Sequence, residues 1–318
     1  MIEYPTTFDE FTSRFSTEEQ CREYLYKLRW PQGYTCPKCG HDKAWKIGSN
    51  LYECGKCGHQ ASVIAGTIFQ GTRKPLSTWF TAIWWVTTQK SGASAKGLQQ
   101  ILGLRTYKTA WTWLHKIRTA MVIPNRRKLS GTVEVDEAYI TGDDIGGKLV
   151  YGLENKTLIV IAVEIVDGKK PGRIRIAVVP GASTQSIKPF IVGNIERGST
   201  VVTGGRASDS LLGTSGYTHS KISQNMRAGE DKLLPRVHMV VSLLKRWLLG
   251  THQGAVSEKH LQAYLDEYVF RFNRREFAAR GLLFYQLLEC AMSIQPTTYD
   301  DLVGKIEVQR DGFFGQVE

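Results

Sequence analysis

The chain has 318 residues, of which 42% are hydrophobic and 22% are charged, and this composition is typical of a soluble globular protein. No apolar run approaches the roughly 20 residues of a membrane-spanning helix, and the N-terminal residues lack the features of a signal peptide, so we expect a cytoplasmic protein with no membrane partner. The net charge of +11 predicts a polyanionic partner, and the absence of a Lys-rich amphipathic helix favours nucleic acid over a membrane surface.

The N-terminal segment, residues 1–30, carries aromatic and apolar side chains at helix-like intervals. Its Ser16-Thr-Glu-Glu19 sequence is typical of a capping box, which predicts a helix from there to about Leu28. No residue pattern in this segment indicates chemistry, so we expect it to be scaffold.

Two Cys-x-x-Cys motifs follow, one from Cys36 to Cys39 and one from Cys54 to Cys57, with 14 residues between them. This spacing is typical of a tetrahedral zinc site with four thiolate ligands. A pair of disulfides is the alternative, and a reducing cytoplasm disfavours it. We therefore predict a structural Zn²⁺ ion in a zinc ribbon that spans residues 31–70.

The region from Ala61 to Ser130 has eleven Lys or Arg residues and no Asp or Glu. A solvated surface normally mixes charges of both signs, so this bias predicts a surface that binds nucleic acid.

Helical periodicity is present in this region over residues 76–89, 94–102 and 107–122. The last two helices are joined by Leu102-Gly-Leu-Arg-Thr106, a turn typical of a helix-turn-helix, and we assign residues 71–128 to such a domain. The N-terminal end of its second helix is where base edges and phosphates are met in such domains. Together with the basic linker that follows, the predicted DNA contacts are Arg105, Tyr107, Lys108, Thr109, Lys116, Arg126, Arg127 and Lys128.

The β-branched run Thr132–Ile140 predicts a strand with one carboxylate, Asp136, near its end. Alternation along a strand places Asp136 on one face with Glu134 and Ala138. A carboxylate in such an apolar strand is costly to bury unless it is paired or binds a cation. The alternative is an Asp that caps or turns the end of the strand.

The remaining sequence alternates between β and α patterns. The predicted strands span residues 157–166, 173–180, 199–203 and 217–222, and the predicted helices span residues 184–196, 234–249 and 259–274. The resulting β-β-β-α-β-α order predicts a mixed sheet with flanking helices in an α+β multidomain protein.

That order, with an acidic residue on its first strand, resembles the ribonuclease H-like core of DDE transposases and integrases. Further motifs make the chain similar to the zinc-ribbon insertion-sequence transposases of bacteria. These motifs are Ala65-Gly-Thr-Ile-Phe69, Trp79-Phe80, Tyr107-Lys-Thr-Ala-Trp111, Val133-Glu-Val-Asp-Glu-Ala-Tyr139, Ser242-Leu-Leu-Lys-Arg-Trp-Leu-Leu-Gly-Thr-His252 and Phe270-Arg-Phe-Asn-Arg-Arg275. The resemblance covers about residues 20–290 and implies a ribonuclease H-like catalytic domain over residues 129–290, followed by a tail at 291–318.

The resemblance implies three catalytic positions that bind metal. Asp136 matches the first, whereas Gly204 stands where the second Asp is expected, because the sequence there is Val202-Thr-Gly-Gly-Arg206. Asp209 is a candidate substitute for the missing carboxylate. His238 matches the third position and precedes Lys245 by seven residues, so both can face one site; a helix cap or a surface histidine is the alternative for His238.

The activity implied by the resemblance is DNA cleavage and strand transfer with Mg²⁺ or Mn²⁺, and Asp136 would bridge two ions. The implied partners are the double-stranded terminal inverted repeats and the target DNA, bound near the nucleoid by a homo-oligomer. Further basic residues expected to hold the DNA backbone are Arg246, Arg271, Arg274 and Arg275.

With Gly204 the second ion loses a ligand, so two other functions stay open. One is a non-catalytic, zinc-containing DNA-binding regulator derived from a transposase. The other is an RNA-processing nuclease on the same core.

Overall fold

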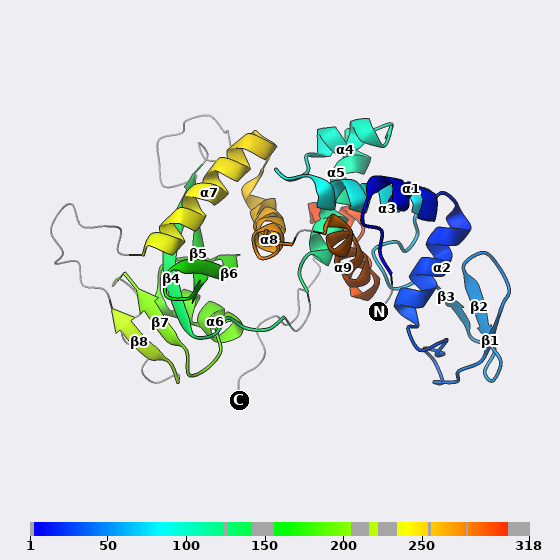
Figure 1. Cartoon of the computed structure of the whole chain (residues 1–318), viewed down its shortest axis with the longest axis horizontal. Helices are drawn as coiled ribbons and strands as arrows, with labels where there is room; N and C mark the ends of the chain where they lie inside the picture. The colour runs from blue at the N-terminus through cyan, green and yellow to red at the C-terminus, as the bar shows by residue number, and fades with distance from the viewer. Residues whose placement is uncertain are drawn as a thin grey trace. The chain divides into compact units, whose positions relative to one another are not determined.

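The computed structural model describes residues 3–123, 126–141, 156–204, 216–221, 234–253, 256–277 and 279–304, with the backbone alone described at Thr141 and Lys221. The described residues up to Ile123, with those from Glu276 onward, form one compact unit, and the described residues between them form a second unit (Figure 1).

The first unit begins with helices α1 (Phe8–Arg14) and α2 (Glu18–Arg29). The predicted capping box at Ser16 and Glu19 is wrong by one residue. The N-cap of α2 is Thr17, whose Oγ1 accepts from the Gln20 N–H at 3.3 Å, while Gln20 Oε1 accepts from the Thr17 N–H at 3.0 Å. Thr17 has the extended backbone of an N-cap, and glutamine closes the box as well as glutamate does.

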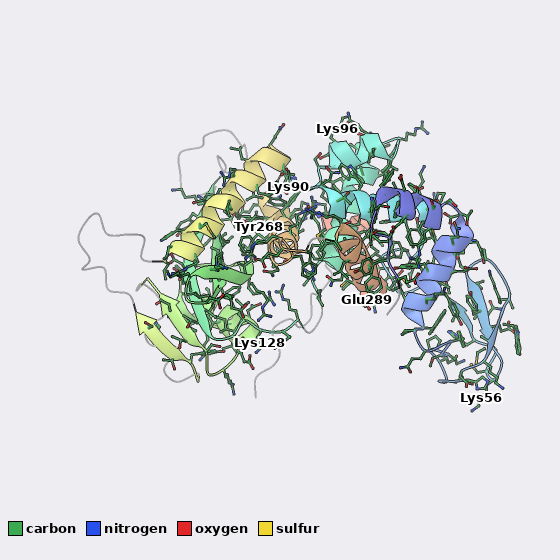
Figure 2. The ribbon with its side chains drawn as sticks, in the orientation of Figure 1. Lys56, Lys90, Lys96, Lys128, Tyr268 and Glu289 are labelled. Carbon is green, nitrogen blue, oxygen red and sulfur yellow. The ribbon has the colours of Figure 1, made fainter. Side chains whose placement is uncertain are left out.

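A three-stranded antiparallel sheet follows, formed by β1 (Ala44–Lys46), β2 (Leu51–Cys54) and β3 (Gln60–Ser62) in the order β1-β2-β3. Lys56, in the turn after β2, is exposed at the outer end of this small domain (Figure 2). Strands this short bury little apolar surface, so other contacts must hold the domain together.

The next three helices are α3 (Leu76–Thr88), α4 (Ala95–Ile101) and α5 (Tyr107–Ala120). Ser94 and Thr106 cap the starts of α4 and α5. Helix α3 follows Pro75, which cannot cap it, and the Glu18 carboxylate accepts from its first N–H groups at 2.9 and 3.0 Å instead.

Helices α9 (Arg280–Ser293) and α10 (Tyr299–Val303) return to the first unit. Helix α9 lies against α2, α3 and α5, and its buried Phe284 contacts the rings of Phe11, Phe80 and Trp84. The resemblance implies a catalytic domain that extends to residue 290, whereas residues from Glu276 onward belong to the first unit, where this aromatic cluster joins α9 to the N-terminal helices.

The second unit is built on a five-stranded sheet of β4 (Thr132–Thr141), β5 (Lys156–Val166), β6 (Lys170–Val178), β7 (Thr200–Thr203) and β8 (Thr218–Lys221). Its order is β6-β5-β4-β7-β8. The first three strands along the chain pair antiparallel, whereas β4 with β7 and β7 with β8 pair parallel. Strand β5 lies in the middle of this antiparallel set and is buried on both faces.

Helices cover both faces of this sheet (Figure 1). Helix α6 (Thr184–Asn194) packs on one face, in a core with Val133 and Val135 of β4. Helices α7 (Pro235–His252) and α8 (Leu261–Phe272) pack on the other face, and the 3₁₀ turn η3 (Glu258–His260) leads into α8. No helix in the described ranges is both long and apolar enough to cross a membrane.

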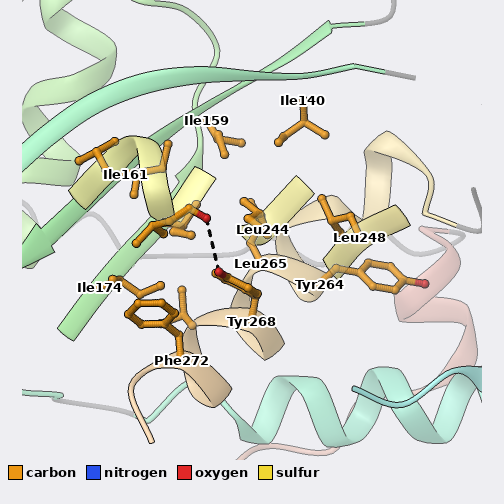
Figure 3. Close-up of a cluster of buried hydrophobic side chains, with 14 of the residues drawn as sticks. Ile140, Ile159, Ile161, Ile174, Leu244, Leu248, Tyr264, Leu265, Tyr268 and Phe272 are labelled. Atoms are coloured by element: carbon orange, nitrogen blue, oxygen red, sulfur yellow. Dashed lines mark hydrogen bonds between the residues drawn. The ribbon is translucent and has the colours of Figure 1, made fainter. Parts of the chain in front are cut away.

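The core under α7 and α8 is a continuous cluster of aliphatic and aromatic side chains (Figure 3). Its one dashed contact joins the Tyr268 hydroxyl, which donates, to the Val240 carbonyl at 3.4 Å. Val240 of α7 is fully buried in this core, whereas its neighbour Val241 is only partly buried. Both positions fit a helical repeat, and the sheet decides which one faces inward.

The exposed edge of β6 is closed by two amide side chains of the α8 region. Gln262 Oε1 accepts from the Val178 N–H at 2.9 Å. Asn273 accepts from the Ile174 N–H at 2.7 Å and donates to the Ile174 carbonyl at 3.1 Å. These amides replace the missing neighbouring strand, so this edge is protected from pairing with another chain.

Candidate metal and nucleic-acid sites

The four cysteines of the paired motifs meet at one point of the small sheet. Their Sγ atoms all lie within 4.8 Å of one another, and no other group of three or more potential ligands occurs among the described residues. Cys36 and Cys57 sulfurs are 3.7 Å apart, and Cys39 and Cys54 sulfurs are 3.6 Å apart. Ligands about 2.3 Å from a tetrahedral zinc ion would be separated by about 3.8 Å. The cysteines are free and fit one Zn²⁺ rather than two disulfides.

The two cysteine motifs have the same backbone conformation. Gly40 and Gly58 follow the second cysteine of each motif with φ of +73° and +65°, a region that side chains disfavour. Their N–H groups donate to the carbonyls of Cys36 and Cys54 at 2.9 and 3.0 Å. The carbonyl of the histidine after each glycine accepts from the N–H of the motif's first cysteine at 2.9 Å. The two turns therefore present their sulfurs symmetrically.

Asp136 lies on the face of β4 that is covered by α7. It is half-buried, and this burial raises its pKa, while the nearby His238 lowers the pKa by a smaller amount. Burial also raises the pKa of Glu137, and the charge of Asp136 raises it further. Asp136 is in the middle of β4 and not at its end, and its ionised form is therefore poorly solvated, which is a setting that favours a cation.

The parallel pairing of β4 and β7 fixes what lies beside Asp136. Val135 is opposite Thr203 at the end of this register, so the next residues along the two strands are Asp136 and Gly204. Residues opposite one another share a face of the sheet. The position expected to hold the second Asp is therefore next to the first one.

Gly204 leaves space at that position. A Cβ atom added there would meet only Leu234 Cδ1, at 3.7 Å, which is an ordinary van der Waals contact, and the backbone is not in the left-handed region. A side chain can therefore begin at this position without a close contact at its Cβ atom. Asp209, the suggested substitute, lies outside the described residues.

His238 and Lys245 are both on α7, and both are half-buried. His238 lies one turn from the start of the helix and influences the charge state of Asp136. Lys245 is seven residues further, about 10 Å along the axis. The fold therefore brings Asp136, Gly204 and His238 together, while Lys245 lies on the same side of α7 two turns away.

Glu134 connects β4 to α7 and was not recognised in the sequence as a functional residue. Only 2% of Glu134 is exposed. Its carboxylate accepts from the N–H groups of Arg236 and Val237 at 2.9 and 3.0 Å and pairs with the Arg236 guanidinium at 3.2 Å. Leu234, the N-cap residue of α7, supplies no side-chain cap. Glu134 caps the helix in its place. Because Glu134 and Asp136 are two residues apart on β4, this cap fixes the start of α7 close to Asp136.

Replacing Glu134 with alanine is expected to destabilise the second unit by about 3–5 kcal/mol, because the buried Arg236 contact and two N–H groups lose their acceptor. The melting temperature should fall by about 6–15 °C. The matched control is Glu137→Ala, since Glu137 has no ion pair among the described residues and should change stability little. Equal shifts for both variants in a thermal melt would show that the cap does not hold the helix.

Replacing Asp136 with asparagine should stabilise the cation-free protein at neutral pH. The pKa of Asp136 is higher in the folded state than in the unfolded state, where it is about 3.9. The protonated carboxyl therefore contributes its full stability to the fold below about pH 3.9, and this contribution is lost as the pH rises through the folded-state pKa. At pH 7, in a buffer without added Mg²⁺ or Mn²⁺, we expect Asp136→Asn to melt on the order of 1–2 °C higher, with the difference vanishing toward pH 4. A lower melting temperature at pH 7 would contradict a poorly solvated carboxylate.

The first turn of α5 is the exposed part of the predicted DNA-binding helix pair. Arg105, Tyr107 and Lys108 are exposed, Thr109 is half-buried, and the first turn holds no acidic residue. The Thr106 hydroxyl caps this end by accepting from the Thr109 N–H at 3.2 Å. Most of the rest of α5 is buried, so a nucleic acid can approach this helix only at its start.

Helix α10 covers part of the same region. Lys108 Nζ lies 3.7 Å from the centroid of the Tyr299 ring, a close cation–π contact. Burial lowers the pKa of Lys116, and Asp301 of α10 partly opposes this effect. Two of the predicted DNA contacts therefore already interact with α10 within the first unit.

Three of the predicted DNA-binding arginines contact side chains of α8 itself, within four residues along the chain. Arg271 pairs with Glu267 at 2.8 Å. Arg274 lies over the Phe270 ring at 4.0 Å, and Arg275 lies over the Phe272 ring at 4.3 Å. Arg275 also donates to the carbonyls of Pro171 and Gly172 on β6, which joins the end of α8 to the sheet, and a phosphate contact by these arginines stays a prediction.

The other predicted basic residues lie on the linker and on α7. Arg126 donates to Asn194 Oδ1 at 3.3 Å, and Lys128 donates to the Val192 carbonyl at 2.7 Å. Arg127 and Arg246 are exposed.

Two family models match these parts of the chain. An ISXO2-like transposase domain matches residues 128–273, which form the second unit, and a transposase zinc-ribbon domain matches residues 16–60, which include α2 and the four cysteines. The two domains define a transposase. The chain belongs to the zinc-ribbon insertion-sequence transposases, as the sequence motifs predicted. No curated protein matches the chain.

Proposed function

We propose that this transposase binds the terminal repeats of an insertion sequence as double-stranded DNA, and that its site for metal-dependent DNA cleavage and strand transfer is impaired because one ligand is missing. The second unit would be a ribonuclease H-like core, an inference supported by its strand order and by the acidic residue on its first strand. The net charge of +11 supports DNA as the partner.

The observation that carries this proposal is the register that sets Gly204 beside Asp136. A two-ion site needs a bridging carboxylate and further oxygen ligands on each ion. Among the described residues here, Asp136 supplies one carboxylate and His238 one imidazole. This donor set fits one Mg²⁺ or Mn²⁺ ion and does not fit two.

The DNA-binding role rests on the zinc ribbon and on the start of α5. Exposed Arg105 and Lys108 offer positive charge and Tyr107 offers a hydroxyl group, and the first turn of α5 itself carries no carboxylate. We expect at least a dimer on DNA, so that two ends can be held together.

Binding to a DNA end taken from beside the gene tests this proposal. In gel-shift titrations, we expect the terminal repeat to bind more tightly than a scrambled duplex or an RNA duplex of the same sequence. The logarithm of affinity should fall linearly with the logarithm of salt concentration. Equal affinity for RNA would favour an RNA-processing nuclease, and the absence of DNA binding would refute the proposal.

A non-catalytic DNA-binding regulator is the second candidate, and Gly204 is the observation that favours it. In that case the metal site at Asp136 lacks other catalytic groups in addition to the carboxylate at position 204. It would bind the DNA end with Mn²⁺ present and leave it uncut, and restoring an acidic residue at position 204 would not produce cleavage.

A further inference from the structure

We propose that the second unit holds a phosphate-binding site at Arg175, on the sheet face opposite Asp136. The expectation that its phosphate belongs to DNA rests on the proposed function. Arg175 is on β6 opposite Ala162 of β5, and Ala162 is opposite Val135 of β4, whose side chain packs in the α6 core. Arg175 is therefore on the α6 side of the sheet and is distinct from the predicted metal site.

Arg175 is a buried cation that no carboxylate neutralises among the described residues. Only 4% of it is exposed. Its Nη1 donates to the Ile174 carbonyl at 2.9 Å and its Nη2 to the Arg127 carbonyl at 2.7 Å, whereas its buried Nε has no partner. Two neutral carbonyls are poor compensation for a guanidinium removed from water.

The contrast with Arg173 makes this arrangement specific. Arg173 is two residues earlier on the same face, and Glu164 accepts from its Nη2 at 2.6 Å and from its Nε at 2.9 Å. Arg173 also donates to the Arg127 carbonyl at 3.3 Å, so both guanidinium groups reach one oxygen atom. Glu164 forms its ion pair with Arg173, whereas it acts on Arg175 only through space and forms no hydrogen bond with it among the described residues.

Further cations surround this pair. The Ile174 carbonyl accepts from both Arg175 and the Asn273 side chain, and Arg274 follows Asn273 in the chain, so it is nearby. Arg175 also donates to the Arg127 carbonyl, and Arg126 is the residue before it. Burial, and after it the charges of Arg126, Arg173 and Arg274, lower the pKa of Arg175 to about 9. Arg175 therefore remains charged at neutral pH. Glu164 next to Arg173 and Asp266 near Arg126 are the acidic groups that act on this cluster.

A tetrahedral oxyanion is the ligand that such a cluster fits, because guanidinium groups bind phosphate oxygens through parallel N–H donors. Arg126 and Arg274 are only half-buried, so the anion would enter on their side and lie next to Arg175. A phosphodiester of bound DNA and free inorganic phosphate share this chemistry. We assign the site to the DNA backbone, since the linker that carries Arg126 and Arg127 leaves the basic region of the sequence.

Thermal melting of the full chain, in phosphate and in chloride of equal ionic strength, tests the site. In chloride, Arg175→Met should melt at the same temperature as the native protein or higher, because a buried charge without a counter-ion is removed. Phosphate should raise the melting temperature of the native protein by about 2–4 °C and leave Arg175→Met unchanged. Arg173→Met is the matched control and should melt lower in both buffers, because Glu164 loses its partner.

A second readout uses DNA and a surface variant that keeps the core intact. Arg126→Met should lose the phosphate response. In both Arg126→Met and Arg175→Met, the slope of the logarithm of terminal-repeat affinity against the logarithm of salt concentration should become shallower by the value of about one phosphate contact. A phosphate response without any change in DNA binding would assign the site to free phosphate and overturn the DNA assignment. A large fall in the melting temperature of Arg175→Met in chloride, with equal phosphate responses in all variants, would overturn the site itself. The phosphate arm needs no DNA, so a failure of the native chain to bind DNA would refute the proposed function alone.

Discussion

Replacing Gly204 with aspartate is expected to increase metal-dependent cleavage of the terminal-repeat DNA by on the order of 10²-fold or more. The register of β4 and β7 sets position 204 beside Asp136, and a Cβ atom there meets only Leu234 Cδ1 at 3.7 Å. The new carboxylate would therefore face the space next to Asp136 and His238. Cleavage of a labelled DNA end, measured with Mn²⁺ and with Mg²⁺, provides the readout.

Two further variants give this prediction its controls. Gly193→Asp adds the same charge to an exposed position of α6 where a Cβ atom meets nothing within 4 Å, so it should leave cleavage unchanged. Asp136→Asn, combined with Gly204→Asp, should abolish the gain. Equal cleavage by the native protein and Gly204→Asp would show that another residue supplies the second ligand.

Removing the zinc ligands is expected to unfold the ribbon completely. The four sulfurs lie within 4.8 Å of one another, the three strands are only three or four residues long, and metal binding in such small domains supplies about 10–16 kcal/mol of folding free energy. In Cys54→Ser, or after treatment with a strong chelator, the zinc content should fall from one ion per chain to none. Residues 31–70 should then become the first site of proteolysis.

Cys290→Ser is the matched control for the ribbon. Cys290 is on α9 and outside the four-sulfur cluster, so its replacement should leave one zinc per chain and the native proteolysis pattern. A ribbon that resists proteolysis after zinc has been removed would mean that its small core is sufficient without the metal.

Features set by nearby residues could be predicted from the sequence. The cysteine spacing predicted the four-sulfur cluster because each pair lies within one turn. Alternation in β4 placed Asp136 and Glu134 on one face, and the β-branched runs predicted all five strands of the second unit. The capping box was wrong by one residue because Ser16 and Thr17 are both suitable caps.

Contacts between distant residues could not be predicted. Glu134 caps a helix that begins 101 residues later, and nothing in the local sequence identifies Arg236 as its partner. The arginines at positions 271, 274 and 275 were interpreted as DNA contacts from their charge alone. Arg275 in fact donates to the carbonyls of Pro171 and Gly172 on β6, more than 100 residues away, and nothing in its local sequence indicates these partners.

The most direct test of the incomplete site is a count of bound Mn²⁺ by electron paramagnetic resonance, with zinc already in the ribbon. We predict at most one Mn²⁺ ion in the native protein, two in Gly204→Asp, and none in Asp136→Asn. Two ions bound to the native protein, or no additional ion after Gly204→Asp, would contradict the account of a phosphoryl-transfer site that lacks a single carboxylate.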